Sequence, residues 1–217
     1  MRLLILLLSS MFFVGCAAPI VKVDIPNIKE SDAANVADLR PASEKENKIF
    51  SLAITSEAYG TYRRGDARLN PPVTRILQHR AYEKFNATGE IPKIKIHHLV
   101  VYANLKSELR RDVTGGFLGG LIGAGIASAT QKNVVDGIAS VMSEEEFRSL
   151  GDEEYKRTLY TEKENPNKAS VFIVYLDAEV NGKRTVVKTM TPTKLADGKN
   201  PHLAAVETAI AYFLQQY

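Results

Sequence analysis

The chain is almost free of cysteine: Cys16 is the only one among 217 residues. Because we expect Cys16 to be consumed by modification, disulfides, CxxC redox chemistry and cysteine nucleophiles are excluded from the rest of the chain. The formal charge is +3, and loss of Arg2 with a leader lowers it to +2, so charge gives no support for a nucleic-acid role. The phosphate-binding spacings GxxxxGK[ST] and GxGxxG and the GxSxG nucleophile elbow are also missing.

The first fifteen residues have the order of parts of a secretory signal peptide. Arg2 gives a short positive start, Leu3–Val14 is apolar, and Gly15 is a small residue before the expected cut. The apolar run is about a dozen residues long, short of the roughly 20 that a membrane-spanning helix needs. We therefore predict a signal peptide at 1–15. An ordinary cleaved leader and a short uncleaved anchor remain alternatives.

The sequence Phe13-Val14-Gly15-Cys16 resembles the lipobox of bacterial lipoproteins. This resemblance implies cleavage before Cys16, a diacylglyceryl group on its thiol, and an amide-linked acyl chain on the new N-terminus. No other cofactor is expected. Two or more acyl chains hold a protein firmly to a bilayer. In the enterobacterial sorting rule, Ala17 after the cysteine implies the outer membrane, with the protein facing the periplasm.

Residues 16–35 are mixed and mostly polar, and we predict that they form the lipidated N-terminus and a tether that lifts the domain off the membrane. A domain is expected at 36–217. Its first half should hold a strand at 36–40 ending at Pro41, a second at Ile49–Ala58, a polar loop at Gly60–Asn70, a helix between Asn70 and Gly89, and a long strand at Ile91–Leu109. Asn70 should cap that helix, whose buried face is Val73, Ile76, Leu77, Ala81 and Phe85. The apolar centre of the long strand, Leu99-Val100-Val101-Tyr102, is expected to be covered on both sides.

The C-terminal part contains a clear hairpin signal. Asn181-Gly182, the preferred pair for a type I′ turn, separates Val171–Val180 from Lys183–Met190 and places Glu179 opposite Arg184. A last helix begins at Asn200-Pro201 and should bury Leu203, Val206, Ile210, Phe213 and Leu214. This order predicts an α+β fold: a mainly antiparallel sheet with helices packed on one face, plus an inserted glycine-zipper helix or helical hairpin.

The insertion at about 112–142 begins with nineteen uncharged residues between Asp112 and Lys132. On a helix, its glycines fall into two adjacent lanes that let helices approach closely. Six interior glycines disfavour an isolated helix by roughly 5 kcal/mol, so packing must offset the cost. We predict self-association through these residues, with a flexible loop or membrane insertion as alternatives; 134–142 is expected to complete a helical hairpin. After it, Ser143-Glu144-Glu145-Glu146 predicts a capping box for a short helix near Phe147. The zipper residues are Gly115, Gly116, Gly119, Gly120, Gly123 and Gly125.

A polar segment supplies the one candidate partner-binding loop. Two tyrosines and two arginines in a long loop suit an anionic or glycan-like partner, and packing of the tyrosines is the alternative. These residues are Tyr59, Tyr62, Arg63 and Arg64. His97 and His98, adjacent in a strand, should point to opposite faces and so make a poor metal site. We expect no metal site and no catalytic residue.

With these parts placed, the chain resembles the small outer-membrane lipoproteins of Gram-negative bacteria. The zipper is similar to that of rickettsial surface-antigen and SlyB-like lipoproteins, and Asp38-Leu39-Arg40-Pro41 with the α+β order resembles the YajG-type lipoproteins. The hypothesis is a non-enzymatic envelope protein with a structural, assembly or partner-binding role, bound to the membrane by lipid and to copies of itself or another envelope protein. A membrane-active or pore-forming oligomer and a ligand-binding periplasmic domain are the alternatives.

Overall fold

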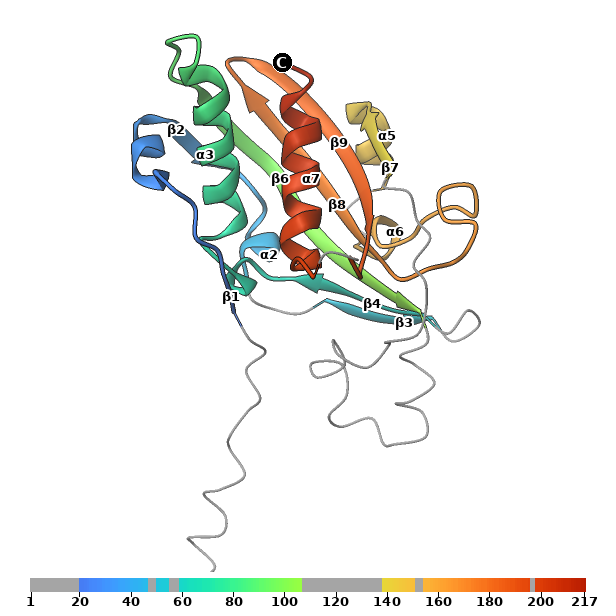
Figure 1. Ribbon diagram of the computed structural model, residues 1–217. Coiled ribbons are helices and arrows are strands. Elements are labelled where there is room, and N and C mark those ends of the chain that lie inside the picture. Colours follow the sequence, from blue (N-terminus) through green and yellow to red (C-terminus); the bar gives the residue numbers. More distant parts are fainter. Residues whose placement is uncertain (1–19, 47–49, 55–58, 107–137, 151–153, 196–197) are drawn as a thin grey trace, which may run out of the picture.

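The computed structural model describes residues 20–46, 50–54, 59–106, 138–150, 154–195 and 198–217 (Figure 1). These ranges form a seven-stranded sheet in the order β3-β4-β6-β8-β9-β7, with β2 pairing on β6. The strands are β2 (Asn35–Asp38), β3 (Ser51–Ile54), β4 (Tyr59–Arg64), β6 (Lys93–Lys106), β7 (Ile138–Met142), β8 (Val171–Val180) and β9 (Lys183–Pro192). Within this sheet the β2–β6 pair is parallel and the other pairs are antiparallel, so the predicted α+β class is confirmed.

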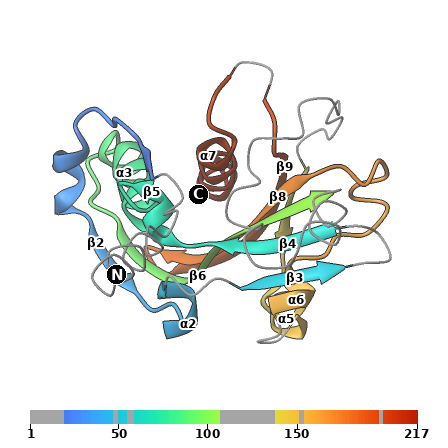
Figure 2. The ribbon, with the colours of Figure 1, turned by 90° about the horizontal axis from the view of Figure 1, so that it is seen from below.

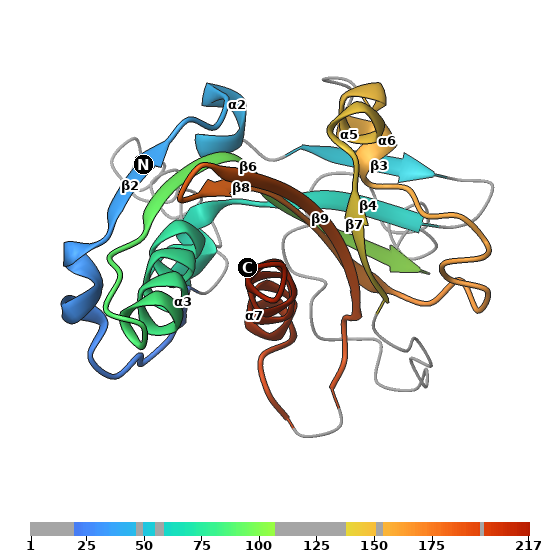
Figure 3. The same ribbon diagram turned by 90° about the horizontal axis from the view of Figure 1, so that it is seen from above.

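Two long helices cover one face of this sheet, and short helices lie on the other (Figures 2 and 3). The long ones are α3 (Val73–Asn86) and α7 (Pro201–Leu214). The short ones are α2 (Ala42–Lys45), α5 (Glu144–Ser149) and α6 (Glu154–Arg157). Each face therefore buries its own apolar cluster. We call them the long-helix face and the short-helix face.

Strand β6 is buried on both sides at its centre, as predicted. Leu99 and Val101 belong to the core beneath α3 and α7, while Val100 and Tyr102 belong to the core beneath the short helices. Alternate residues of a strand point to opposite faces, so a strand covered twice needs apolar residues at every position.

The β8–β9 hairpin has the predicted turn. Asn181 and Gly182 have φ angles of 50° and 89°, the positive values that a type I′ turn requires. Glu179 stands opposite Arg184 in the register, as expected. Their side chains nevertheless have other partners: Arg184 bonds both oxygens of the buried Asp177, at 2.8 and 2.7 Å. The expected cross-strand ion pair is therefore wrong, because a buried carboxylate competes for the guanidinium.

Helix signals in the sequence are largely confirmed. Asn200 caps α7 by accepting bonds from the backbone of His202 and Leu203, and Ser143 forms a capping box with Glu146 at α5. The predicted cap by Asn70 is wrong, because α3 begins at Val73 and its N-cap position is Pro72, which has no side chain to bond the first turn. The buried faces contain the expected residues, except that Phe85 and Leu203 are partly buried.

The segment predicted as a tether packs on the domain from residue 21 onward. Strand β1 (Val21–Lys22) pairs in parallel with β5 (Leu69–Asn70), and the 3-10 helix η2 (Ile28–Ala33) lies against α3. Ile25 is 7 % exposed and Ser31 is fully buried. The tether prediction is therefore wrong for residues 21–35, which belong to the fold. The burial of these residues depends on packing against α3 and β5, and both elements come much later in the chain.

The part of the insertion that the structure describes is extended. Residues Ile138–Met142 form β7, an edge strand paired with β9, so the predicted helical hairpin is wrong over this stretch. Its side chains alternate in burial, as in a strand: Ile138 and Met142 pack on the short-helix core, and Val141 is 51 % exposed.

Candidate functional site

The segment predicted as a polar binding loop is strand β4, between β3 and β6. The loop prediction is therefore wrong for this stretch, and strand alternation separates Arg63 from Tyr62 and Arg64. Arg63 reaches the short-helix face, where it bonds Glu154 of α6. Arg64 lies over Tyr62 and over Phe172 of β8, a member of the long-helix core. The backbone of Tyr59 begins the strand. The candidate residues thus do not form one surface.

Arg63 belongs to a buried ionic cluster on the short-helix face. Its guanidinium lies 3.0 Å from Glu154 Oε1, and it donates to the carbonyl of Ser43 in α2. A second arginine, Arg157 of α6, lies 3.0 Å from Glu44 Oε1. The same oxygen is 2.8 Å from His98 Nδ1. We call Arg63, Glu154, Arg157, Glu44 and His98 the buried ionic cluster.

Aromatic rings enclose this cluster. The His98 and Phe147 ring centres are 4.9 Å apart, and Arg157 lies 5.3 Å from the centre of the Phe147 ring. Tyr102 donates to Glu154 Oε1 at 3.4 Å, and burial raises the pKa of its phenol. Burial also raises the pKa of Glu154, against the opposing charge of Arg63. Such a cluster fastens α2 and α6 to the sheet, because each buried charge depends on a partner from another element.

A third buried arginine, Arg40, closes the end of β2. Arg40 is 4 % exposed and donates to both carboxylate oxygens of Asp38 and of Asp66, at 2.7 to 3.1 Å. Burial alone would raise the pKa of Asp38, but the bonds and charge of Arg40 hold it below the usual value. The Asp38-Leu39-Arg40-Pro41 motif thus ends β2 with an ion pair. The Arg40 guanidinium bonds the carboxylates of Asp38 and Asp66.

On the long-helix face, Arg64 of β4 and His202 in the first turn of α7 both lie against Phe172 of β8. The Arg64 Cζ lies 5.0 Å from the Tyr62 ring centre and 5.7 Å from that of Phe172. The His202 and Phe172 ring centres are 5.8 Å apart. Three elements distant in sequence therefore place a guanidinium and an imidazole on one phenyl ring.

His202 is 4 % exposed, and its surroundings are electropositive. Burial, together with the charges of Arg64 and Arg68, lowers the pKa of His202 to about 3. Arg68 immediately precedes Leu69, the β5 residue that pairs with Val21 of β1. This cationic corner therefore lies beside the N-terminal end of the fold, which Figure 1 shows at the lower end of the molecule.

The adjacent histidines of β6 do not alternate as predicted. The register with β8 shifts between Ile96 and His98, so the strand has a bulge at His97. As a result Ile96 and Leu99 both lie in the long-helix core, and His98 packs on Phe147 across the sheet. Burial and the charge of Arg184 lower the pKa of His97. Within the described ranges, no three His, Cys, Asp or Glu residues are arranged to hold a metal ion.

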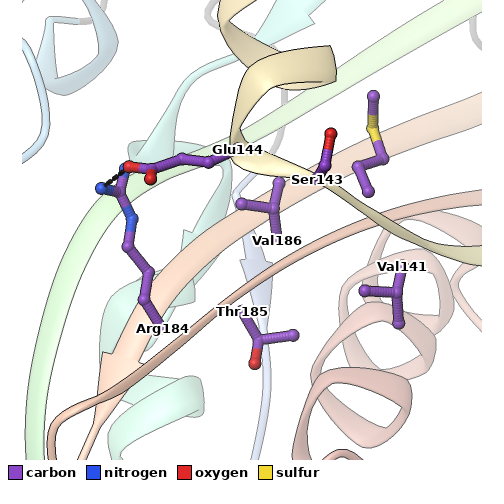
Figure 4. A pocket seen from close by; sticks show the side chains of 7 residues that line it. Val141, Ser143, Glu144, Arg184, Thr185 and Val186 are labelled. Atoms are coloured by element: carbon purple, nitrogen blue, oxygen red, sulfur yellow. Dashed lines mark hydrogen bonds and ion pairs between the residues drawn. The ribbon is translucent and has the colours of Figure 1, made fainter.

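A shallow hollow lies where β7 ends and α5 begins (Figure 4). Its volume is about 260 Å³, and an ion pair between Glu144 and Arg184 crosses one side of it. Its lining is Val141, Met142, Ser143, Glu144, Arg184, Thr185 and Val186. The charged groups at its edge are occupied by each other, so it offers a ligand few donors.

The remaining predicted site residues lie outside the described part of the chain. These are Cys16 and the glycines of the zipper. Among the residues that the structure does describe, no helix has the length and apolar character to span a bilayer.

Comparison with protein-family models, curated proteins and solved structures returned no match for this chain. The site therefore rests on its own geometry. Sequence reasoning named Tyr62 and Arg64 but missed Phe172 and His202. The sequence held one local signal for the burial of His202. The residue lies directly after Asn200-Pro201, in the first turn of an apolar helix, and packing of that turn on the sheet buries it.

Proposed function

We propose that this chain is a lipid-anchored, non-catalytic protein of the bacterial outer membrane that binds a partner at the membrane surface. The observation that carries the proposal is the spacing between Cys16 and the fold. Strand β1 begins at Val21, and the five residues from 16 to 20 span at most about 18 Å. The 20-residue tether expected from sequence would span up to ~70 Å. An acylated Cys16 thus holds the β1–β5 end of the domain against the bilayer.

The orientation can be measured because the chain has no second cysteine. In acylated protein the Cys16 thiol is blocked, so a cysteine introduced at Lys22 or at Lys183 is the one site for a fluorophore. Lys183 lies at the β8–β9 turn, the end of the molecule opposite β1 (Figure 1). We expect nitroxide lipids with labelled headgroups to quench a probe at Lys22→Cys several-fold more than one at Lys183→Cys.

Equal quenching at the two positions would contradict the membrane-apposed domain. The anchor itself is tested separately in cells. The parent chain should take up labelled palmitate and sediment with outer membranes. Cys16→Ala should lose the label, and retention of both label and membrane association would sink the lipid anchor.

Self-association through the zipper is the second part of the proposal. Its support is energetic: six glycines in eleven residues are costly in an isolated helix, and close helix packing offsets that cost. The double change Gly119→Leu with Gly123→Leu should shift the acylated protein to a smaller species in detergent, measured by light scattering. The matched change Leu118→Ala with Leu121→Ala leaves the small-residue lanes intact and should alter the oligomer less. An unchanged mass after the glycine changes would refute assembly through the zipper.

A further inference from the structure

Arg64 has no ion-pair partner among the residues that the structure describes. Its guanidinium is held by the rings of Tyr62 and Phe172, and its Nε is buried without a hydrogen-bond partner. Arginine is a good donor for oxyanions, because its planar fork can bond two oxygens at once. In contrast, the neighbouring Arg63 has its carboxylate at 3.0 Å. Arg64 is thus positioned by ring contacts, while its buried Nε donor remains unused.

His202 provides the second unused donor. The residue is 4 % exposed, yet its Nε2 has no hydrogen-bond partner. Buried polar atoms in native proteins are nearly always bonded, so an orphan of this kind points to a group that the protein chain itself does not supply. Its imidazole packs against the ring of Phe172, which the guanidinium of Arg64 also contacts.

The field at this corner favours an anion. The charges that act on His202 come from Arg64 and Arg68, and both are positive. The N-terminus of the 14-residue helix α7 adds the positive end of its dipole. Because Asn200 already bonds the first backbone N–H groups of α7, the helix contributes field rather than donors.

We propose that Arg64 and His202, both held on Phe172, form a binding site for a phosphate-type oxyanion. Arg64 donates from its fork, and neutral His202 donates from Nε2 in the tautomer that carries the proton there. The anion can be free phosphate or the phosphate of a lipid headgroup. Arg68 lies one residue from the β1–β5 pair, so a domain anchored through Cys16 presents this corner to the headgroups. That lipid source rests on the proposed anchor, whereas the oxyanion site does not.

The imidazole of His202 reports on the site directly. The full chain in neutral detergent is titrated with inorganic phosphate, and the histidine ring signals are followed by NMR. We expect the His202 signals alone to move saturably and its pKa to rise, because a bound anion stabilises the imidazolium. Arg64→Gln should weaken binding at least about tenfold, the effect of losing one charged hydrogen bond. Arg64→Lys keeps the positive charge but loses the planar fork, so its phosphate affinity should lie between those of the parent and Arg64→Gln.

The matched control is Arg148→Gln, which removes a 73 % exposed arginine from α5 on the other face. It should bind phosphate as the parent does. Equal affinity of the Arg64 and Arg148 variants, or unmoved His202 signals in the folded parent, would overturn the oxyanion site. Circular dichroism of each variant confirms that it is folded.

Vesicles then identify the source of the anion. Phosphatidylglycerol vesicles that shift His202 in the parent, but not in Arg64→Gln, would assign the site to a lipid headgroup. A response to inorganic phosphate with none to these vesicles would assign it to a soluble anion. Since the phosphate titration requires no acyl chain, failure of the lipid anchor and failure of this site give different results.

Discussion

Arg63 and Arg64 are neighbours in β4, yet one is fully paired and the other is not. Arg63 enters the short-helix face, where Glu154 and a carbonyl of the α2 segment receive it. Arg64 enters the long-helix face, where two aromatic rings hold it and no carboxylate faces it among the described residues. Strand alternation thus divides one short basic motif between two environments. Buried charges that pair with one another tie elements of the fold together, whereas a buried donor without a protein partner is a candidate contact for a ligand.

The largest effect is expected where the paired side is broken. Glu44→Leu removes the carboxylate that lies 3.0 Å from Arg157 and 2.8 Å from His98, and so takes a counter-charge away from a buried guanidinium. Loss of one partner of a buried ion pair typically costs about 3–5 kcal/mol of unfolding free energy. Urea unfolding, followed by circular dichroism, measures the change.

A double variant distinguishes lost pairing from lost packing. Glu44→Leu with Arg157→Met removes both charges and should recover part of the stability that the single change loses, since apolar side chains can replace a buried pair. Glu145→Gln, on the exposed first turn of α5, should stay within about 0.5 kcal/mol of the parent. A double variant no more stable than Glu44→Leu would show that the cluster is not held by charge pairing.

The elements that sequence predicted well have local causes. Asn181-Gly182 sets its own turn, Asn200 caps its own helix, and Ser143 forms its capping box within four residues. The centre of β6 is equally easy to recognise in the sequence, because a strand buried on both faces is a continuous apolar run without alternating polar residues. In each case the residues that determine the element lie within it.

Strand β4 and the N-terminal segment were missed because their causes are distant. Tyr59–Arg64 is polar in composition and becomes a strand through its pairing with β3 and β6. Ile25 is buried by elements that follow later in the chain. The buried ionic cluster joins Arg63 to Glu154 across some 90 positions, so no spacing rule could find it. Tyr62 and Arg64 were recognised, but their register with Phe172 depends on the same long-range pairing.

His202 predicts a loss of stability as pH falls, opposite in sign to the effect of the raised pKa of Glu154 on the paired side. The pKa of His202 is about 3 in the folded chain and near 6.5 when unfolded. The unfolded state therefore binds more protons between these values. Stability from neutral His202 is complete above pH 6.5 and is lost as pH falls toward 3. Each pH unit in this window costs about 1.4 kcal/mol, so unfolding at pH 5 should need about 2 kcal/mol less than at pH 7 from this residue.

His202→Gln removes this titration and should flatten the slope of unfolding free energy between pH 7 and pH 5. Saturating phosphate should also flatten the slope in the parent, because an anion beside His202 raises its folded pKa toward the unfolded value. In Arg64→Gln, phosphate should have little effect on that slope. The difference between the pH slopes measured with and without phosphate thus reports the contribution of the Arg64–His202 corner. A parent slope unchanged by both phosphate and His202→Gln would remove the contrast between the two faces.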